Sequence, residues 1–379
     1  MKKNLYLDYA AAAPLSDSTK EYLIQVLDIC GNPSSRHSAG GEAYALIENA
    51  RKAVAEFIHA DSGSIFFTSG GCASNTLAVR GFAGKQPLCH IFYSPIAHKS
   101  ITECISSLDC DNTSIKAGND GLLDLEHLDS LCKTACSGGK LPFAVVDYAN
   151  SEIGTVQDIK RISEIVHRYN GILYVDCTGS IPSIPLNVKA LDIDMCGFSA
   201  HKLGALKGCG VLYKKKSMEL EPLIYGTQEQ GLFGGTENVP GIASLLHVIK
   251  NYDYSGIHSH SRDYVCDYIS ENIEDAYLVG SKVHRLPHNL YLCLRGIEGE
   301  ALMVLLDMNG IQVSTGSACS SKSLEPSPAL LAIGMEKEDL HSCIRISFSG
   351  KERKEELDYL CNTLKSSVNM LRNLNRERT

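Results

Sequence analysis

Phe198-Ser199-Ala200-His201-Lys202 follows a short apolar segment near the middle of the chain. A lysine just past the end of a strand suits an enzyme that holds a carbonyl cofactor through its amine, as a Schiff base. The serine hydroxyl and the histidine can hydrogen-bond a phosphate group on the same cofactor. By itself the string has an alternative interpretation as an ordinary surface turn.

A second stretch upstream, Ile172-Leu173-Tyr174-Val175-Asp176, has the pattern of a buried strand that ends in an acid. A carboxylate at a strand end can pair with a protonated ring nitrogen, which an electron-sink cofactor requires. The two stretches together predict a cofactor site at the ends of neighbouring strands.

Strand-like and helix-like segments alternate through most of the chain from residue 65 onward. This order predicts an α/β fold with a mostly parallel sheet and helices on both of its faces. Ligands in such sheets bind at the carboxyl ends of the strands, where the suggestive residues fall. The expected strands are 65–68, 88–93, 143–147, 172–176, 195–198 and 211–213, with helices around 122–131 and 159–169.

The pattern changes near residues 251–256, where we expect a smaller C-terminal α+β domain to begin. Apolar residues at steps of three or four predict that this domain closes with a long helix from Leu357 to Leu371. Ser16 is expected to cap an early helix. We therefore expect a large cofactor-binding domain over 15–250 and a small domain formed by 1–14 and 251–379, which carries a mobile cysteine loop at about 314–327.

Composition excludes some classes of function. The 379 residues include 36 basic and 44 acidic side chains, a net charge of −8, which disfavours direct nucleic-acid binding and a membrane-surface role. No 18-residue apolar run and no secretion signal are found, so a cytoplasmic location is predicted. The 15 scattered cysteines contain no Cys-x-x-Cys pair, and we expect buried small hydrophobes and no metal site.

Two further strings fit cofactor chemistry. The stretch 68–74, TSGGCAS, follows a strand and opens a helix, so its backbone N–H groups and the helix dipole can hold an anion. His98 begins a helix, where a neutral imidazole can stack on a cofactor ring and shuttle protons. The alternatives are a plain strand-to-helix turn and a surface histidine.

Two others fit substrate chemistry. Cys319 lies in the string STGSACSS at 314–321, and small neighbours suit a nucleophilic thiolate that must travel. Arg345, flanked by Ile344 and Ile346, can hold a substrate carboxylate bidentately from a rigid strand. Its alternative is a structural salt bridge.

These strings together resemble the cysteine desulfurases, pyridoxal-phosphate enzymes of the aminotransferase class V group with the type I fold. The long cysteine loop is similar to that of the subgroup linked to iron–sulfur cluster assembly and tRNA thiolation. The matches cover almost the whole chain: Leu7-Asp8-Tyr9, Gly31-Asn32-Pro33-Ser34-Ser35, Phe67-Thr68-Ser69-Gly70, His98-Lys99, Glu152-Ile153-Gly154, Val175-Asp176, Phe198 to Lys202, Gly235-Thr236, Gly316-Ser317-Ala318-Cys319 and Ser323-Leu324-Glu325-Pro326-Ser327.

The resemblance implies a role for each matched residue. Lys202 would form the Schiff base, Asp176 would pair with the pyridine nitrogen, and His98 would stack on the ring. Cys319 would take sulfur from L-cysteine as a persulfide and leave alanine. The remaining implied contacts are Ser199, His201, Gly70, Gly71 and Cys72 for the phosphate, Thr236 of the other subunit of a homodimer, Ser151 near the phenolic oxygen, and Arg345 with Asn32 for the substrate carboxylate.

The sequence departs from the family pattern at the cofactor. The phosphate-binding threonine is Cys72 and the acid after it is Ala73, while an arginine before Gly-Thr is Phe233. The two side chains that donate to the phenolic oxygen are replaced by Ser151 and Gly179. A hydrogen bond to a charged group contributes about 1.5–3 kcal/mol. Losing two donors therefore predicts weaker cofactor binding and a raised pKa of the Schiff base.

We favour an active but divergent cysteine desulfurase, because the lysine, aspartate, histidine, cysteine and arginine are all present. Its expected partners are L-cysteine, a sulfur-acceptor protein such as an iron–sulfur scaffold or a tRNA-thiolation enzyme, and a second copy of the chain. Two alternatives stay open: a related lyase acting on selenocysteine or cysteine sulfinate, and a degenerate paralogue that acts as a scaffold.

Overall fold

A large sheet organises the fold of the computed structural model, which describes residues 4–316 and 326–376. Its strand order is β2-β8-β7-β6-β5-β3-β4. The run from β7 to β4 is parallel, whereas β8 is antiparallel to both of its neighbours. The strands are β2 (Ile65–Thr68), β3 (Cys89–Tyr93), β4 (Asn112–Ser114), β5 (Leu141–Asp147), β6 (Ile172–Asp176), β7 (Met195–Ser199) and β8 (Gly210–Lys214). The predicted α/β fold with a mostly parallel sheet is confirmed.

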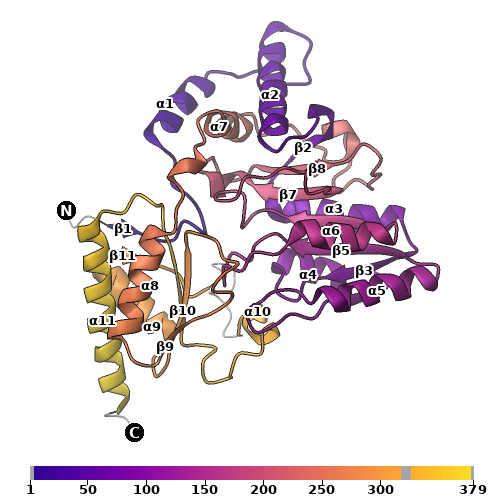
Figure 1. Cartoon of the computed structure of the whole chain (residues 1–379). Coiled ribbons are helices and arrows are strands. Elements are labelled where there is room, and N and C mark those ends of the chain that lie inside the picture. Colours follow the sequence, from indigo (N-terminus) through magenta and orange to yellow (C-terminus); the bar gives the residue numbers. More distant parts are fainter. Residues whose placement is uncertain (1–3, 317–325, 377–379) are drawn as a thin grey trace.

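Helices cover both faces of this sheet (Figure 1). Alternate residues of each strand point to opposite faces, so Ala144 and Val146 join one apolar core while Phe143 and Val145 join another. The first core includes α2 (Ser38–Phe57), α5 (Leu125–Ser137), α6 (Ile159–Arg168) and α7 (Val239–Lys250). The second includes α3 (Gly71–Lys85) and α4 (Lys99–Ser106).

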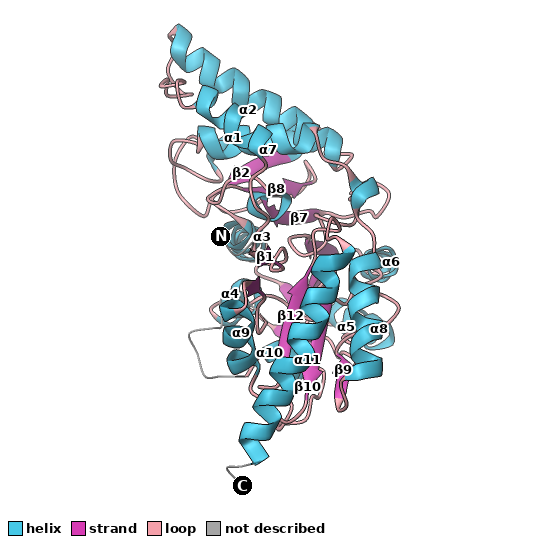
Figure 2. Ribbon diagram, turned by 90° about the vertical axis from the view of Figure 1, so that its left-hand side faces the viewer, coloured by secondary structure: helices cyan, strands magenta, loops and turns pink. Residues whose placement is uncertain are grey.

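Two smaller sheets form around a separate apolar core. One is antiparallel in the order β12-β10-β9, and the other pairs β1 with β11 in parallel. Their strands are β1 (Leu5–Tyr6), β9 (Ala276–Leu278), β10 (Asn289–Leu294), β11 (Ile311–Gln312) and β12 (Cys343–Ser347). The core also holds α8 (His260–Asn272), α9 (Gly299–Met308) and α11 (Lys354–Arg376), and Figure 2 shows α8 and α11 side by side across the antiparallel sheet.

A fourth apolar cluster joins the two regions. Ile96 and Ile153, from loops after β3 and β5, pack with Tyr291 of β10, Cys343 of β12 and the short helix α10 (Pro328–Ala332). The other elements are α1 (Asp17–Val26) and the 3-10 helices η1 (Ser62–Ser64), η2 (Ala200–Leu203), η3 (Glu229–Gly231) and η4 (Tyr254–Gly256). This cluster fixes the β12 sheet against the loops at the carboxyl edge of the large sheet.

Local signals explain where the elements begin. Ser16 caps α1 as predicted, because its Oγ accepts a hydrogen bond from the Thr19 N–H at 3.1 Å. The helix expected around 122–131 begins only at Leu125, since the Asp124 side chain caps it. Strand β4 was not predicted, because its sequence Asn-Thr-Ser carries no apolar alternation.

None of the helices in the described parts of the chain is long and apolar enough to cross a membrane.

Candidate active site

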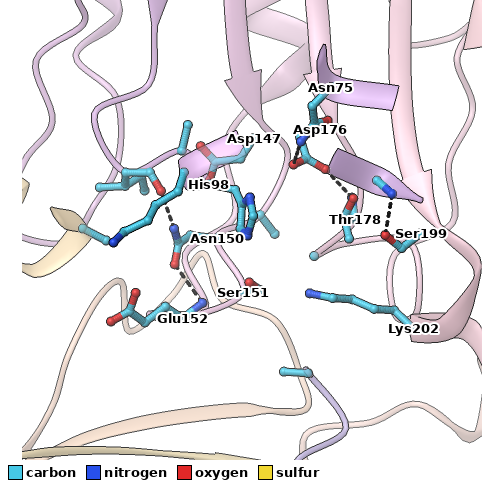
Figure 3. Close-up of a pocket in the computed structure, with 18 of the residues that line it drawn as sticks. Asn75, His98, Asp147, Asn150, Ser151, Glu152, Asp176, Thr178, Ser199 and Lys202 are labelled. Carbon is cyan, nitrogen blue, oxygen red and sulfur yellow. Dashed lines mark hydrogen bonds between the residues drawn. The ribbon is translucent and has the colours of Figure 1, made fainter. Parts of the chain in front are cut away.

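A cavity of about 210 Å³ lies at the carboxyl ends of β5, β6 and β7 (Figure 3). Its wall also includes the first turn of α3, residues 96–99 and 149–152, and Arg345 of β12. Ligands of open α/β sheets bind at this edge. The sequence-predicted residues that line it are Gly71, Cys72, His98, Ser151, Asp176, Ser199, His201, Lys202 and Arg345.

Lys202 enters the cavity from η2, directly after β7. This helix ends at Leu203, and the next residue, Gly204, has a φ of 91°, in the left-handed region that glycine adopts without strain. Figure 3 shows the amine of Lys202 extended toward the middle of the cavity, with Ser199 beside its base. The strand and the tight turn after it therefore deliver a primary amine to the site.

Asp176 is the last residue of β6 and is held by two hydrogen bonds. Its Oδ2 accepts from Asn75 Nδ2 at 2.9 Å, and its Oδ1 accepts from the Thr178 N–H at 2.8 Å. Asn75 is fixed in turn, because its Oδ1 accepts from the Tyr174 hydroxyl. The donors keep this nearly buried carboxylate in one orientation, facing the cavity.

The turn from β2 into α3 forms an anion cradle. Gly71 N–H donates to Ser199 Oγ at 2.8 Å, and a β-carbon at Gly71 would lie only 2.6 Å from that oxygen and 2.9 Å from Thr178 Oγ1. Thr178 Oγ1 is buried and has no hydrogen-bond partner among the described residues. A helix N-terminus with small residues and a spare hydroxyl suits a phosphate. Cys72 and His201 line the same cavity.

His98 caps α4 and forms part of the cavity wall. Its Nδ1 accepts a hydrogen bond from the Ser100 N–H at 3.1 Å. Burial lowers the pKa of His98 below its ordinary value, although the Asp176 carboxylate opposes that shift. A neutral imidazole that accepts at Nδ1 carries its proton on Nε2. His98 can therefore exchange a proton through Nε2.

Arg345 reaches the cavity from β12 and is nearly fully buried. Its Nη2 forms a salt bridge with Asp8 Oδ1 at 2.8 Å, and its Nη1 donates to the Ser151 carbonyl at 3.0 Å. The Arg345 Nε is buried without a hydrogen-bond partner among the described residues. The guanidinium is therefore held in one orientation on the cavity wall, with its Nε left unsatisfied by the described residues.

Some predicted site residues lie elsewhere. Asn32 and Thr236 are exposed and do not line the cavity, and the Asn32 side chain accepts from the Ser34 N–H. Gly70 precedes the first turn of α3, one residue before the cavity wall. Cys319 lies outside the described residues.

The structure also brings in residues that the sequence interpretation missed. Asn75 orients Asp176 from one turn into α3, a position that the helix start at Gly71 could have indicated. Asp147 ends β5 as Asp176 ends β6, so the same strand-end signal was present in the sequence. The other missed residues in the wall include Asn150, Glu152, Thr178 and Ser327.

Glu152 and Asn150 order the loop after β5. Glu152 accepts from Tyr291 at 3.0 Å and from Ser327 at 2.8 Å, which connects this loop to β10 and to the residues just before α10. Asn150 Oδ1 accepts from the backbone N–H groups of Glu152 and Ile153. These bonds hold the Ser151 backbone in place on the cavity wall.

Gly179 has a steric reason for lacking a side chain. A β-carbon at this position would lie 2.3 Å from the carbonyl oxygen of Ala149. The loops that follow β5 and β6 thus pack too closely for any larger residue. Because this backbone arrangement leaves no room for a side chain at Gly179, no side-chain donor can be present at that position.

An amine, an oriented carboxylate and an anion cradle around one cavity define a lysine-based enzyme with the fold of pyridoxal-phosphate transferases. Residues 5–360 match the aminotransferase class-V family. The cysteine desulfurase IscS of Dictyoglomus turgidum is 36% identical over 386 residues, covering 99% of this chain and 97% of that protein. The chain belongs to the aminotransferase class-V family, in its cysteine desulfurase group.

Solved structures agree with this assignment. A NifS-like protein, 28% identical, superposes with a TM-score of 0.88 over 97% of this chain and 100% of the other. A structure titled SspA in complex with cysteine, 26% identical, superposes with a TM-score of 0.80 over 92% and 100%. Pyridoxal phosphate is the cofactor of this family, and the cradle at Gly71, the spare Thr178 hydroxyl, Lys202 and Asp176 fit its phosphate, aldehyde and ring nitrogen.

Proposed function

We propose that this protein is a cysteine desulfurase that converts L-cysteine to L-alanine and takes the sulfur onto Cys319 as a persulfide. The arrangement of Lys202 opposite Asp176 in one cavity carries this proposal. The full-length similarity to an IscS protein supports the reaction, and a structural neighbour in complex with cysteine supports the substrate. The sulfur balance is simple: the thiol of Cys319 becomes a persulfide as cysteine becomes alanine.

Each residue has a proposed task. Pyridoxal phosphate, when bound, supplies an electron sink for the bonds around the α-carbon of an amino acid. The Lys202 amine would hold the cofactor aldehyde, and Asp176 would keep the ring nitrogen protonated. His98 would stack on the ring and exchange a proton through Nε2, while Ser199, His201 and the Gly70–Cys72 turn would bind the phosphate.

The substrate side uses the buried arginine. We assign Arg345 to the substrate carboxylate, because it lines the cavity and a fixed guanidinium gives directional charge-assisted bonds. Its salt bridge to Asp8 sets the orientation of the group. Asn32 is assigned to the same carboxylate. Thr236 is assigned to the cofactor of the partner subunit in a homodimer, and its exposure is what a contact across subunits requires.

The division into a large domain (15–250) and a small domain (1–14 with 251–379) is also a proposal. The separate apolar core around β10 and β12, which includes Leu7, supports it. Transfer of sulfur to an acceptor protein and a cytoplasmic location stay predictions.

The direct test is alanine release from L-cysteine by the pure protein, with pyridoxal phosphate and a reductant added. We expect catalytic alanine formation that is lost in Lys202→Ala. Cys319→Ala should abolish persulfide formation while cofactor binding is kept, and Cys136→Ala, an exposed thiol at the end of α5, is the matched control. Sulfur release that is unchanged in Cys319→Ala would contradict the role of that thiol.

No alanine from a protein that binds the cofactor would favour the lyase alternative, which rates on selenocysteine and cysteine sulfinate would then test. A protein that does not bind pyridoxal phosphate at all would favour the scaffold alternative.

A further inference from the structure

Asp147 lines the cavity together with the acids Asp176 and Glu152, and the proposed roles give it no task. It ends β5 and is paired in register with Asp176 at the end of β6, so the two side chains lie on the same face of the sheet. Both residues line the cavity, and Figure 3 shows Asp147 near His98, across from Asp176. The site therefore holds two neighbouring carboxyl groups on adjacent strands.

The two carboxyl groups differ in the hydrogen bonds that they accept. Asp176 accepts hydrogen bonds on both oxygens, whereas both oxygens of Asp147 are buried with no hydrogen-bond partner among the described residues. An ionised carboxylate that is buried without partners is strongly unfavourable, and such a group is stable only when it is neutral or when a ligand completes it. Burial raises the pKa of Asp147 to about 6; the nearby Ser94 hydroxyl opposes this and Asp176 adds to it.

The strand order says which side of a bound cofactor Asp147 would face. Ser199 ends β7 and Lys202 follows it in η2, on one side of Asp176, whereas Asp147 comes from β5, on the other side. In pyridoxal phosphate the phosphate arm and the phenolic oxygen lie on opposite sides of the line from ring nitrogen to aldehyde. With the phosphate in the cradle at Gly71 and Ser199, the phenolic oxygen would be directed to the β5 side.

The β5 side is also where the chain departs from the family pattern. Gly179 offers no side chain, and the Ala149 carbonyl occupies the space where one would start. Family members donate to the phenolic oxygen from two positions. In this chain one of them is Gly179 and the other is Ser151. A carboxylic acid that keeps its proton is a hydrogen-bond donor, so an adjacent neutral acid can replace a missing donor.

We propose that Asp147 binds the cofactor as a neutral carboxylic acid and donates a hydrogen bond to its phenolic oxygen. The proposal rests on the proposed function, because it requires pyridoxal phosphate in this cavity. It predicts that cofactor binding at alkaline pH takes up a proton at Asp147. Affinity should then fall with rising pH above about 6, by about tenfold for each pH unit.

Other ionisable groups line the same cavity and titrate as well, so the test must be a difference between variants. They are Asp176, Glu152, His98, Lys99, His201, Lys202, Cys72 and Arg345. Asp147→Asn keeps the shape and a donor but cannot titrate. Asp147→Leu keeps a similar size and removes the donor.

The measurement is the dissociation constant of pyridoxal phosphate from the cofactor-free protein between pH 6 and 8. Calorimetry in two buffers of different ionisation heat gives the protons taken up. At pH 8 the wild type should take up about one proton per site more than Asp147→Asn. At pH 6 the wild type and Asp147→Asn should bind alike, and Asp147→Leu should bind about tenfold more weakly.

Equal proton uptake by the wild type and Asp147→Asn would overturn the proposal, even if Asp147→Leu fails to fold. Wild-type affinity in a folded Asp147→Leu would also overturn it, while leaving the proposed function intact. A wild-type protein that does not bind the cofactor at any pH would overturn the proposed function and this proposal together.

Discussion

Buried aspartates lie at both the amino edge and the carboxyl edge of the large sheet, where its strands begin and end. One of them accepts hydrogen bonds from described residues and the other does not. Asp194 precedes β7 at the amino edge and accepts from Lys215 Nζ, His167 Nε2 and the Leu173 N–H, each at 2.8 Å. Asp147 ends β5 at the carboxyl edge and has no such partner among the described residues. The two side chains are about equally buried.

The partners reverse the effect of burial on the two acids. Burial alone would raise the pKa of Asp194, but its hydrogen bonds from His167 and Lys215 lower it below the ordinary value. The pKa of Asp147 rises to about 6 instead. The chain itself supplies hydrogen-bond donors to the acid that stabilises the fold. An acid that lacks such donors is available to bind a ligand.

The largest expected effect is the loss of the satisfied acid. Asp194→Asn should lower the free energy of unfolding by about 3 kcal/mol, because it leaves the charges of Lys215 and His167 facing a neutral amide. Urea unfolding of the cofactor-free protein measures this. The matched control is Asp192→Asn, which contacts the same lysine and histidine from a half-exposed position and should cost less than about 1 kcal/mol. Equal losses in the two variants would contradict the role of burial.

The sequence allowed the carboxyl edge to be predicted better than the amino edge, for a physical reason. Lys202, Asp176 and the glycines at residues 70 and 71 follow strands directly, and strand ends are visible in a one-dimensional apolar pattern. The pairing of Asp194 with Lys215 depends on a strand order that the pattern does not contain. The same holds for Arg345 and Asp8, which are 337 residues apart in the chain.

Some of the site was hidden for a different reason. The sequence marks Asp147 and Asp176 equally, as acids at the ends of apolar strands. Only the packed structure shows that Asn75 reaches Asp176, whereas the Asp147 oxygens have no hydrogen bond of normal geometry to any described residue, the nearby Ser94 hydroxyl included. The steric exclusion at Gly179 likewise depends on the Ala149 carbonyl of a neighbouring loop.

The second expected effect has the opposite sign. Asp147→Asn should raise the free energy of unfolding of the cofactor-free protein above pH 6, by about 2 kcal/mol. The folded-state pKa of Asp147 is raised, so its contribution to stability is present below the unfolded pKa and is lost as pH rises through about 6. The difference between variant and wild type should therefore vanish toward pH 4. A variant that is less stable than wild type at pH 8 would show that Asp147 has a partner in the fold.

The smallest effect concerns the histidine of the satisfied edge. The hydrogen bond to Asp194 raises the pKa of His167, against the opposing effect of its partial burial. A raised folded-state pKa means that the contribution of this pair is present below the unfolded pKa of histidine and is lost as pH rises through the folded pKa. We expect a fall of about 1 kcal/mol in the free energy of unfolding on the alkaline side of that window. The fall is measured as the difference in the free energy of unfolding between the wild type and His167→Gln at each pH, because the titration of Asp147 cancels in that difference. The fall should be absent when the same comparison is made in the Asp194→Asn background. If the fall persists in the Asp194→Asn background, the half-exposed Asp192 and not the buried Asp194 keeps His167 protonated. The difference between the aspartates at the amino and carboxyl ends of the strands would then depend less on their burial.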